Sequence, residues 1–155
     1  MKGTSDAPEL TADAAAGEAL RQRVRDFLVE ESEGGLVSAY LFGSVASGSS
    51  HRESDVDVAV LLHRGRFPRR TERSEERIRL LSGLMAALGR NDVDLVVLND
   101  LPPRFGRHVV TVGERLLCLD PETDLRFRCQ VQLLAADLDV FMRRMEPLKL
   151  EALRR

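Results

Sequence analysis

A short segment rich in glycine and serine joins two apolar stretches of the chain, 37–42 and 55–62, and constrains the fold more than any other part of the sequence. Valine or leucine stands at every even position from 56 to 62. Together with the small and polar residues between 55 and 59, this alternation predicts a β-strand with two different faces. Asp55 and Asp57 are two residues apart, so their side chains share one face of that strand. The chain must therefore build a sheet that carries two neighbouring carboxylates beside a tight turn.

Hydrophobic periodicity predicts a small mixed domain around this pair of strands. Apolar residues at helical spacing predict helices, and short apolar or alternating runs predict strands. The helices are expected at 11–33, 73–88, 102–113 and 121–146, and the strands at 37–42, 55–62, 93–98 and 115–119. The order of these elements indicates an α/β or α+β fold, with a mixed sheet of about four strands, helices packed on it, and a long C-terminal helix.

The same pattern divides the chain into three parts. Residues 1–10 are expected to form a flexible N-terminus, and 11–146 a single domain of ordinary size. Pro147 is expected to end or kink the last helix, because a proline inside a helix removes one hydrogen bond and clashes with the preceding turn. Residues 147–155 would then form a C-terminal tail.

Each long helix is expected to bury one apolar stripe against the sheet. The stripes comprise Leu20, Val24, Phe27 and Leu28 in the first helix, Ile78, Leu81, Leu84, Met85 and Leu88 in the second, and Phe127, Val131, Leu134, Leu138, Phe141 and Met145 in the last. The first and last helices are also natural candidates for contact with a partner protein. Any apolar residues of these stripes that stay exposed would mark such an interface.

The composition argues against several classes of protein. Lysine and arginine total 23 against 25 aspartates and glutamates, and the net charge of −2 argues against a protein that grips long nucleic acid through its phosphates. No apolar run approaches the ~18 residues of a membrane span, and the first residues lack the pattern of a secretion signal. We therefore expect a cytoplasmic protein with neither a membrane segment nor a long nucleic-acid partner.

The paired carboxylates of Asp55 and Asp57 are suited to bind a hard divalent cation. They repel each other unless a cation lies between them, and Mg²⁺ prefers oxygen ligands and substrate phosphates. A solvated edge strand carries the same pattern, so the pair alone does not distinguish a metal site from an exposed strand face. Gly43 favours a site for a metal ion and a phosphate, because small residues after a strand let backbone N–H groups approach a phosphate. Asp94, at the start of the strand predicted at 93–98, could complete the metal cage, and Asp92 is its rival.

The stretch 43–60, GSVASGSSHRESDVDVAV, resembles the signature of the nucleotidyltransferase superfamily that includes DNA polymerase β. Its small alanine and glycine positions, and its ending Ser-Asp-x-Asp-x-x-Val, are similar to the minimal nucleotidyltransferase (MNT) branch. A weaker resemblance extends over about residues 36–120. There, VDLVVL at 93–98 is similar to the strand that carries the third carboxylate of the family.

The resemblance implies a role for each residue of the motif. Asp55, Asp57 and Asp94 would be catalytic and would ligate two Mg²⁺ ions, with Asp94 also helping to deprotonate the attacking hydroxyl. Asp94 is preferred to Asp92 because the apolar strand of the family follows it. The residues expected to bind the nucleotide are Gly43 and Ser44, which would hold the β- and γ-phosphates, together with Ser54 and Arg52.

The length and near-neutral charge of the chain bear on its substrate. Polymerase relatives carry extra domains that hold nucleic acid, for which 155 residues leave little room. The chain is similar in size to the MNT half of HEPN/MNT toxin–antitoxin pairs, which implies transfer of AMP from ATP to a tyrosine of a cognate HEPN ribonuclease toxin. Two alternatives stay open: an antitoxin that acts by binding alone, and a stand-alone nucleotidyltransferase that acts on RNA ends or on an antibiotic hydroxyl.

Overall fold

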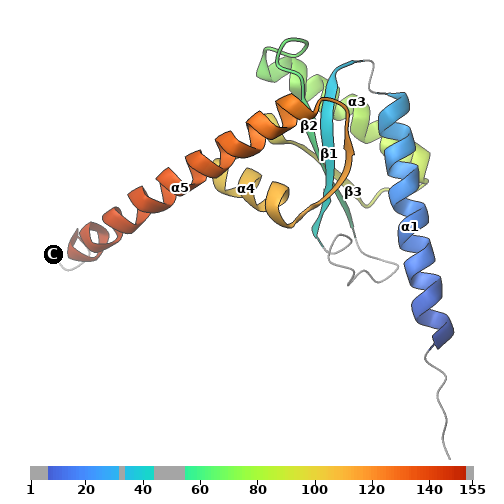
Figure 1. The fold of residues 1–155 in the computed structure, drawn as a ribbon, viewed down its shortest axis with the longest axis horizontal. Helices are drawn as coiled ribbons and strands as arrows, with labels where there is room; N and C mark the ends of the chain where they lie inside the picture. The colour runs from blue at the N-terminus through green and yellow to red at the C-terminus, as the bar shows by residue number, and fades with distance from the viewer. Residues whose placement is uncertain (1–6, 32–33, 44–54, 153–155) are drawn as a thin grey trace, which may run out of the picture.

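A four-stranded mixed sheet forms the centre of the protein (Figure 1). The structure, a computed structural model, describes residues 7–31, 34–43 and 55–152, except for the side chains of 7–13 and 146–152. The helices are α1 (Ala7–Glu30), α3 (Arg70–Leu88), α4 (Pro103–Val112) and α5 (Pro121–Ala152), with a 3₁₀ turn at Leu98–Asp100; the strands are β1 (Leu36–Phe42), β2 (Val56–Leu62), β3 (Val93–Val97) and β4 (Glu114–Cys118). This order confirms the predicted fold class and sequence of elements.

The strands lie in the order β3-β2-β1-β4. β1 is antiparallel to both β2 and β4, whereas β2 and β3 run parallel. The chain therefore reaches β3 from β2 through the crossover helix α3, as a parallel pair requires.

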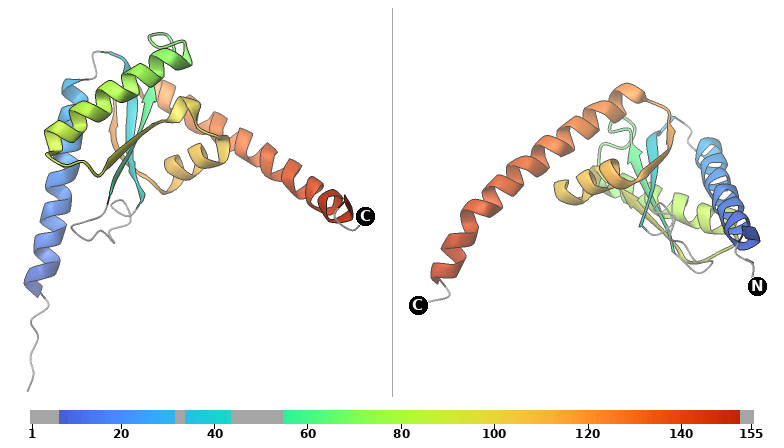
Figure 2. Two further views of the ribbon diagram at one scale, coloured as in Figure 1. Left: turned by 180° about the vertical axis from the view of Figure 1, so that it is seen from behind. Right: turned by 60° about the horizontal axis from the view of Figure 1, so that its bottom comes forward.

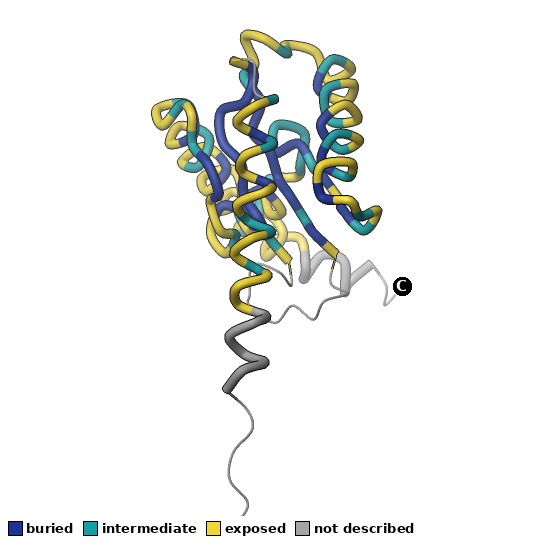
Figure 3. Tube along the Cα trace, turned by 90° about the vertical axis from the view of Figure 1, so that its right-hand side faces the viewer, coloured by how far each residue is buried: buried dark blue, intermediate teal, exposed yellow. Residues whose placement is uncertain are grey.

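Helices cover both faces of the sheet, as the two views of Figure 2 show. α1 and α3 pack on one face, where the side chains of Val56, Val58 and Val60 lie in the larger apolar core. α4 and α5 pack on the other face, where Ala59 and Leu61 lie in a second core. Buried residues follow the strands and the inner sides of the helices in Figure 3. The alternation predicted for β2 is thus confirmed by the cores that its two sets of side chains join.

Local chemistry explains where α3 begins and ends. Its first turn follows Arg69, whose backbone N–H donates to the Glu72 carboxylate at 2.9 Å and so satisfies a group that the helix leaves open. It stops at Gly89, which adopts a left-handed conformation with φ of +66°.

Three helices extend beyond their predicted ends, and α3 does so by beginning at Arg70 rather than 73. α1 begins at Ala7 rather than 11, because Pro8 lies in its first turn, where a proline is tolerated. α5 continues through Pro147 to Ala152 instead of ending at 146, because leucine, lysine, glutamate and alanine follow the proline and all favour helix. Residues 147–152 are therefore helical. The extent of the single domain, 11–146, stays a prediction.

The predicted apolar stripes are confirmed in α1 but only partly in the other two helices. In α3, Ile78 is 60% exposed and Leu80 is buried in its place, because the inward line of that helix runs through residues 80, 84 and 88. In α5, Val131 is buried, and Ala135 is the last buried residue among those whose side chains the structure describes. Beyond Ala135 the helix extends past the sheet (Figure 1), although Asp139 still pairs with Arg104 and Arg107 of α4 at 2.9 Å. The expectation that Leu134, Phe141 and Met145 are buried is wrong. Within the described residues, no helix combines the length and apolarity needed to cross a membrane.

A buried carboxylate fastens the base of α5 to the sheet. Asp124 is 1% exposed. It accepts hydrogen bonds from Ser38 Oγ at 2.6 Å and Tyr40 Oη at 2.7 Å, both on β1. Its other oxygen accepts one from Arg115 of β4 at 2.9 Å. Burial, followed by the hydrogen bond to Asp124, raises the pKa of Tyr40, so the phenol stays protonated as a donor.

Replacing Asp124 with asparagine should destabilise the fold by about 2 kcal/mol or more, because Arg115 then faces a partner without charge inside a buried network. Urea unfolding followed by circular dichroism measures the loss. The matched control is Glu122→Gln, in the same turn of α5 but on its exposed side, which should change stability by less than ~0.5 kcal/mol. Equal stability of the two variants would contradict a structural role for the network.

Candidate active site

The predicted carboxylates meet at one end of the sheet. Asp57 lies in β2 directly opposite Asp94 of β3 in the parallel register, and Phe42, the last residue of β1, is its partner on the other side. Asp55 lies just before β2 and is exposed. Because β2 alternates, Asp57 faces the same side of the sheet as Ala59, the side covered by α4 and α5. The sheet thus holds Asp57 and Asp94 side by side, beside the end of β1.

Gly43 follows the last residue of β1 and lies against the side chain of Asp57. Its φ of +74° is a left-handed conformation that glycine adopts without strain. A Cβ atom at this position would lie 2.2 Å from Oδ2 of Asp57, far inside van der Waals contact. The chain therefore leaves β1 in direct contact with a carboxylate, and a side chain at 43 would strain the left-handed backbone and displace that carboxylate.

The electrostatics of Asp57 are those of a site that favours a cation. Burial raises the pKa of Asp57, and the negative charges of Asp94 and Asp55 raise it further. A bound divalent cation would reverse these effects, because it offsets the repulsion and replaces the lost solvation. Within the described part of the chain, no three His, Cys, Asp or Glu side chains form a ready-made metal cage. The pair is nevertheless suited to Mg²⁺, which commonly takes one or two carboxylates and completes its shell with water and substrate phosphates.

Arg77 of α3 reaches over the edge of the sheet to Asp94. Its Nη2 lies 3.3 Å from Oδ1 of Asp94, and its Nε donates to the backbone carbonyl of Leu95. The N–H of Leu95 also donates to Oδ1 of Asp94, at 2.8 Å. Oδ1 of Asp94 is thus contacted both by the Arg77 side chain and by the backbone N–H of Leu95. Sequence patterns do not predict a role for Arg77, because a contact between a helix and the strand after it depends on how the two pack.

Asp92, the rival third carboxylate, is held elsewhere. Nε of Arg90 donates to Oδ1 of Asp92 at 2.6 Å, and a second contact joins Nη2 to Oδ2. The hydrogen bonds from Arg90 lower the pKa of Asp92. Its backbone carbonyl accepts a hydrogen bond from the N–H of Val56 at 2.9 Å, so the residue fastens the start of β2. The geometry therefore favours Asp94, which faces Asp57, over Asp92.

Three predicted nucleotide-binding residues, Ser44, Arg52 and Ser54, lie outside the described residues. Their roles stay predictions. The neighbouring described positions, Gly43 and Asp55, bracket this segment and lie beside Asp57 in the site.

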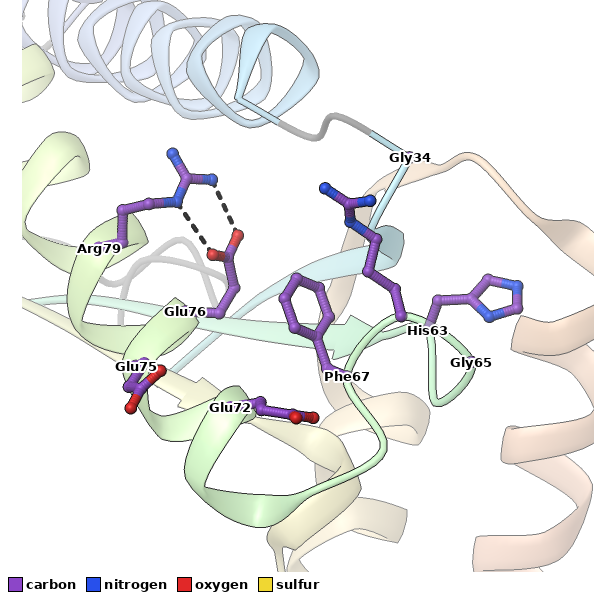
Figure 4. A pocket seen from close by; sticks show the side chains of 9 residues that line it. Gly34, His63, Gly65, Phe67, Glu72, Glu75, Glu76 and Arg79 are labelled. Carbon is purple, nitrogen blue, oxygen red and sulfur yellow. Dashed lines mark hydrogen bonds and ion pairs between the residues drawn. The ribbon is translucent and has the colours of Figure 1, made fainter.

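A separate hollow of about 910 Å³ lies at the opposite end of β2 (Figure 4). It is lined by His63, Phe67 and residues of α3, and it contains none of the predicted site residues. Its charged groups partly neutralise each other, as in the ion pair between Glu76 and Arg79 at 2.8 Å. This hollow is therefore separate from the place where the carboxylates meet.

A mixed sheet with facing carboxylates at its end, beside a glycine turn, is suited to bind phosphates together with a divalent cation. The family model "Polymerase beta, Nucleotidyltransferase" matches residues 23–122, and the chain belongs to this nucleotidyltransferase family. The match contains Asp55, Asp57, Asp92 and Asp94.

Comparisons with individual proteins agree with this family. Protein adenylyltransferase MntA of Shewanella oneidensis is 40% identical over 77 residues, which span half of this chain and half of that relative. A chain in a crystal structure of a toxin–antitoxin with AMP-PNP is similar with a TM-score of 0.64 and 26% identity, over 84% of this chain and 98% of that one. The structure of tri-AMPylated Shewanella oneidensis HEPN toxin in complex with MNT antitoxin gives a TM-score of 0.60 at 23% identity, over 86% and 98% of the two chains. At that identity the likeness concerns the fold alone.

Replacing Gly43 with alanine should lower nucleotidyl transfer about a hundredfold, because the new Cβ displaces the Asp57 carboxylate, and small misplacements of a catalytic group have effects of this size. Gly34→Ala is the matched control. Gly34 has the same φ of +74°, but nothing lies within 4 Å of its Cβ position. Both variants should lose roughly 1 kcal/mol of stability, and only the first should lose activity. Equal activities would contradict the contact.

The choice between Asp94 and Asp92 can be tested in the same assay. Asp94→Asn should lower the transfer rate a hundredfold or more, a rise of roughly 3 kcal/mol in the barrier, because it removes a carboxylate that faces Asp57. Asp92→Asn should leave the rate nearly unchanged and slightly lower the thermal midpoint, because it weakens the pair with Arg90. The reverse pattern would make Asp92 the third carboxylate.

Proposed function

We propose that this protein transfers AMP from ATP to a hydroxyl of a separate toxin protein and thereby neutralises the toxin. The observation that carries the proposal is the facing pair of Asp57 and Asp94 in contact with Gly43, in a chain of the nucleotidyltransferase family. ATP as donor is supported by the adenylyltransferase name of the Shewanella relative and by the AMP-PNP of the similar toxin–antitoxin structure.

Two Mg²⁺ ions are the proposed cofactors, with Asp55, Asp57 and Asp94 as their ligands. The repulsion that raises the pKa of Asp57 supports a cation at this corner, because a bound cation relieves that repulsion. When bound, a pair of such ions stabilises the charge on the attacking and leaving oxygens of a displacement at phosphorus.

The reaction would be an in-line displacement at the α-phosphorus of ATP. The acceptor oxygen forms a bond to that phosphorus, the bond from the phosphorus to the bridging oxygen breaks, and pyrophosphate leaves with the electron pair. Asp94 is proposed to accept the proton of the acceptor hydroxyl. Gly43 and Ser44 are proposed to bind the β- and γ-phosphates through their N–H groups, and Ser54 and Arg52 to bind the nucleotide.

The proposed acceptor is a tyrosine of a cognate HEPN ribonuclease toxin. The resemblance of residues 43–60 to MNT antitoxins supports this choice, as does the AMPylated HEPN toxin in the Shewanella complex with a chain of the same fold. The chain spans half the length of the curated relative that it matches, so the acceptor and the partner are carried over as proposals.

The test incubates the purified protein with Mg²⁺, ATP labelled at the α-phosphate, and the HEPN protein encoded beside it. Label should appear on the toxin, and mass spectrometry should place AMP on a tyrosine. Asp57→Asn should abolish labelling, because it removes a metal ligand at the centre of the site. Asp26→Asn, which changes an exposed carboxylate on α1, is the matched control and should label the toxin as the wild type does.

Two results would redirect the proposal. If wild type and Asp57→Asn both protect cells from the toxin without labelling it, the protein acts by binding alone. If the toxin stays unlabelled while RNA ends or an antibiotic hydroxyl accept AMP, the enzyme has a different acceptor. If none of these substrates becomes labelled, the proposal that the protein transfers AMP is refuted.

A further inference from the structure

The outer part of α5 carries a row of apolar side chains that the described structure leaves largely exposed. Leu134, Phe141 and Met145 are 46%, 53% and 37% exposed, and Leu138 between them is half-buried. These four residues are the last four members of the stripe predicted to be buried. The helix carries them away from the sheet (Figure 1), while Asp139, within the same stretch, pairs with Arg104 and Arg107 of α4. A soluble protein rarely leaves a row of this kind uncovered, so it marks an interface.

The spacing of this row defines the type of partner. Leu134, Leu138, Phe141 and Met145 follow one another at intervals of four, three and four residues, which is the a/d pattern of a two-helix coiled coil. We call these four residues the α5 seam. Its length of roughly 17 Å follows from the helical rise. A second helix is therefore the surface that fits the seam.

Charges beside the seam indicate which helix fits. Asp137 and Arg144 are exposed and occupy the same position of successive heptads, next to the seam. Neither has an ion-pair partner among the described residues. If a second copy of α5 packs antiparallel, with Leu134 opposite Met145 and Leu138 opposite Phe141, Asp137 comes beside Arg144 of that copy. The twofold symmetry of such a pair repeats the contact, so one interface gains two ion pairs.

We propose that the α5 seam is a self-association surface through which two copies of this protein form an antiparallel dimer. The seam complements itself both in its apolar layers and in its flanking charges. The base of each α5 is fixed to its own sheet by Asp124, so the outer helix is presented to the second copy in a defined direction. This inference does not depend on the proposed enzymatic activity.

Sedimentation equilibrium of the full chain, from low to high micromolar concentration, tests the proposal. The wild type should approach twice the mass of the chain, and Phe141→Glu should sediment as a monomer. Ile78→Glu is the matched control, since Ile78 is exposed on α3, which covers the face of the sheet away from α5, and this variant should dimerise as the wild type does.

A charge exchange tests the antiparallel register. Asp137→Arg alone and Arg144→Asp alone should each weaken the dimer about tenfold or more, because each places like charges together twice. The double variant Asp137→Arg/Arg144→Asp should restore wild-type affinity. A monomeric wild type at high micromolar concentration, a dimeric Phe141→Glu, or a double variant no better than the single ones would overturn the proposal. So would a monomeric wild type whose complex with the HEPN toxin is lost in Phe141→Glu, since the seam would then belong to the toxin.

Discussion

The parallel pairing of β2 with β3 is the constraint on which the candidate site depends. It places Asp57 opposite Asp94, and this is an unfavourable arrangement of like charges in the absence of a cation. The pairing persists because the alternate residues Val56 and Val58 pack in the core on the other face. A slip of one residue would send the carboxylates into that core and the valines out of it. Burial of the valines on one face of the sheet thus keeps the two carboxylates close together on the other face, despite their repulsion.

The two faces of the sheet differ in what their side chains contribute: one carries most of the apolar core and the other carries the polar groups. The face under α1 and α3 carries most of the apolar core and contributes Arg77, which reaches around the edge to Asp94. The face under α4 and α5 carries the carboxylates at one end and, further along, the polar network of Asp124. That network joins β1, β4 and α5, so the strand that ends beside the site and the helix that projects from the body share one anchor.

Much of this arrangement follows from the sequence. The alternation in β2 places Asp57 on one face, and an apolar strand beginning with Val93-Asp94 brings the third carboxylate to the same end. Periodicity does not say what covers an apolar stripe, and for this reason it failed at Ile78 and in the outer part of α5. Periodicity also does not predict contacts such as that between Arg77 and Asp94, which depend on the packing of one element on another.

The contact between Gly43 and Asp57 has a consequence for variation at these two positions. Every L-amino acid other than glycine places its Cβ in the same spot, so the choice of residue at 43 is a matter of shape and not of polarity or charge. A larger residue there would have to displace the carboxylate of Asp57 from its position opposite Asp94. The residue at 43 therefore sets where the carboxylate at 57 can lie.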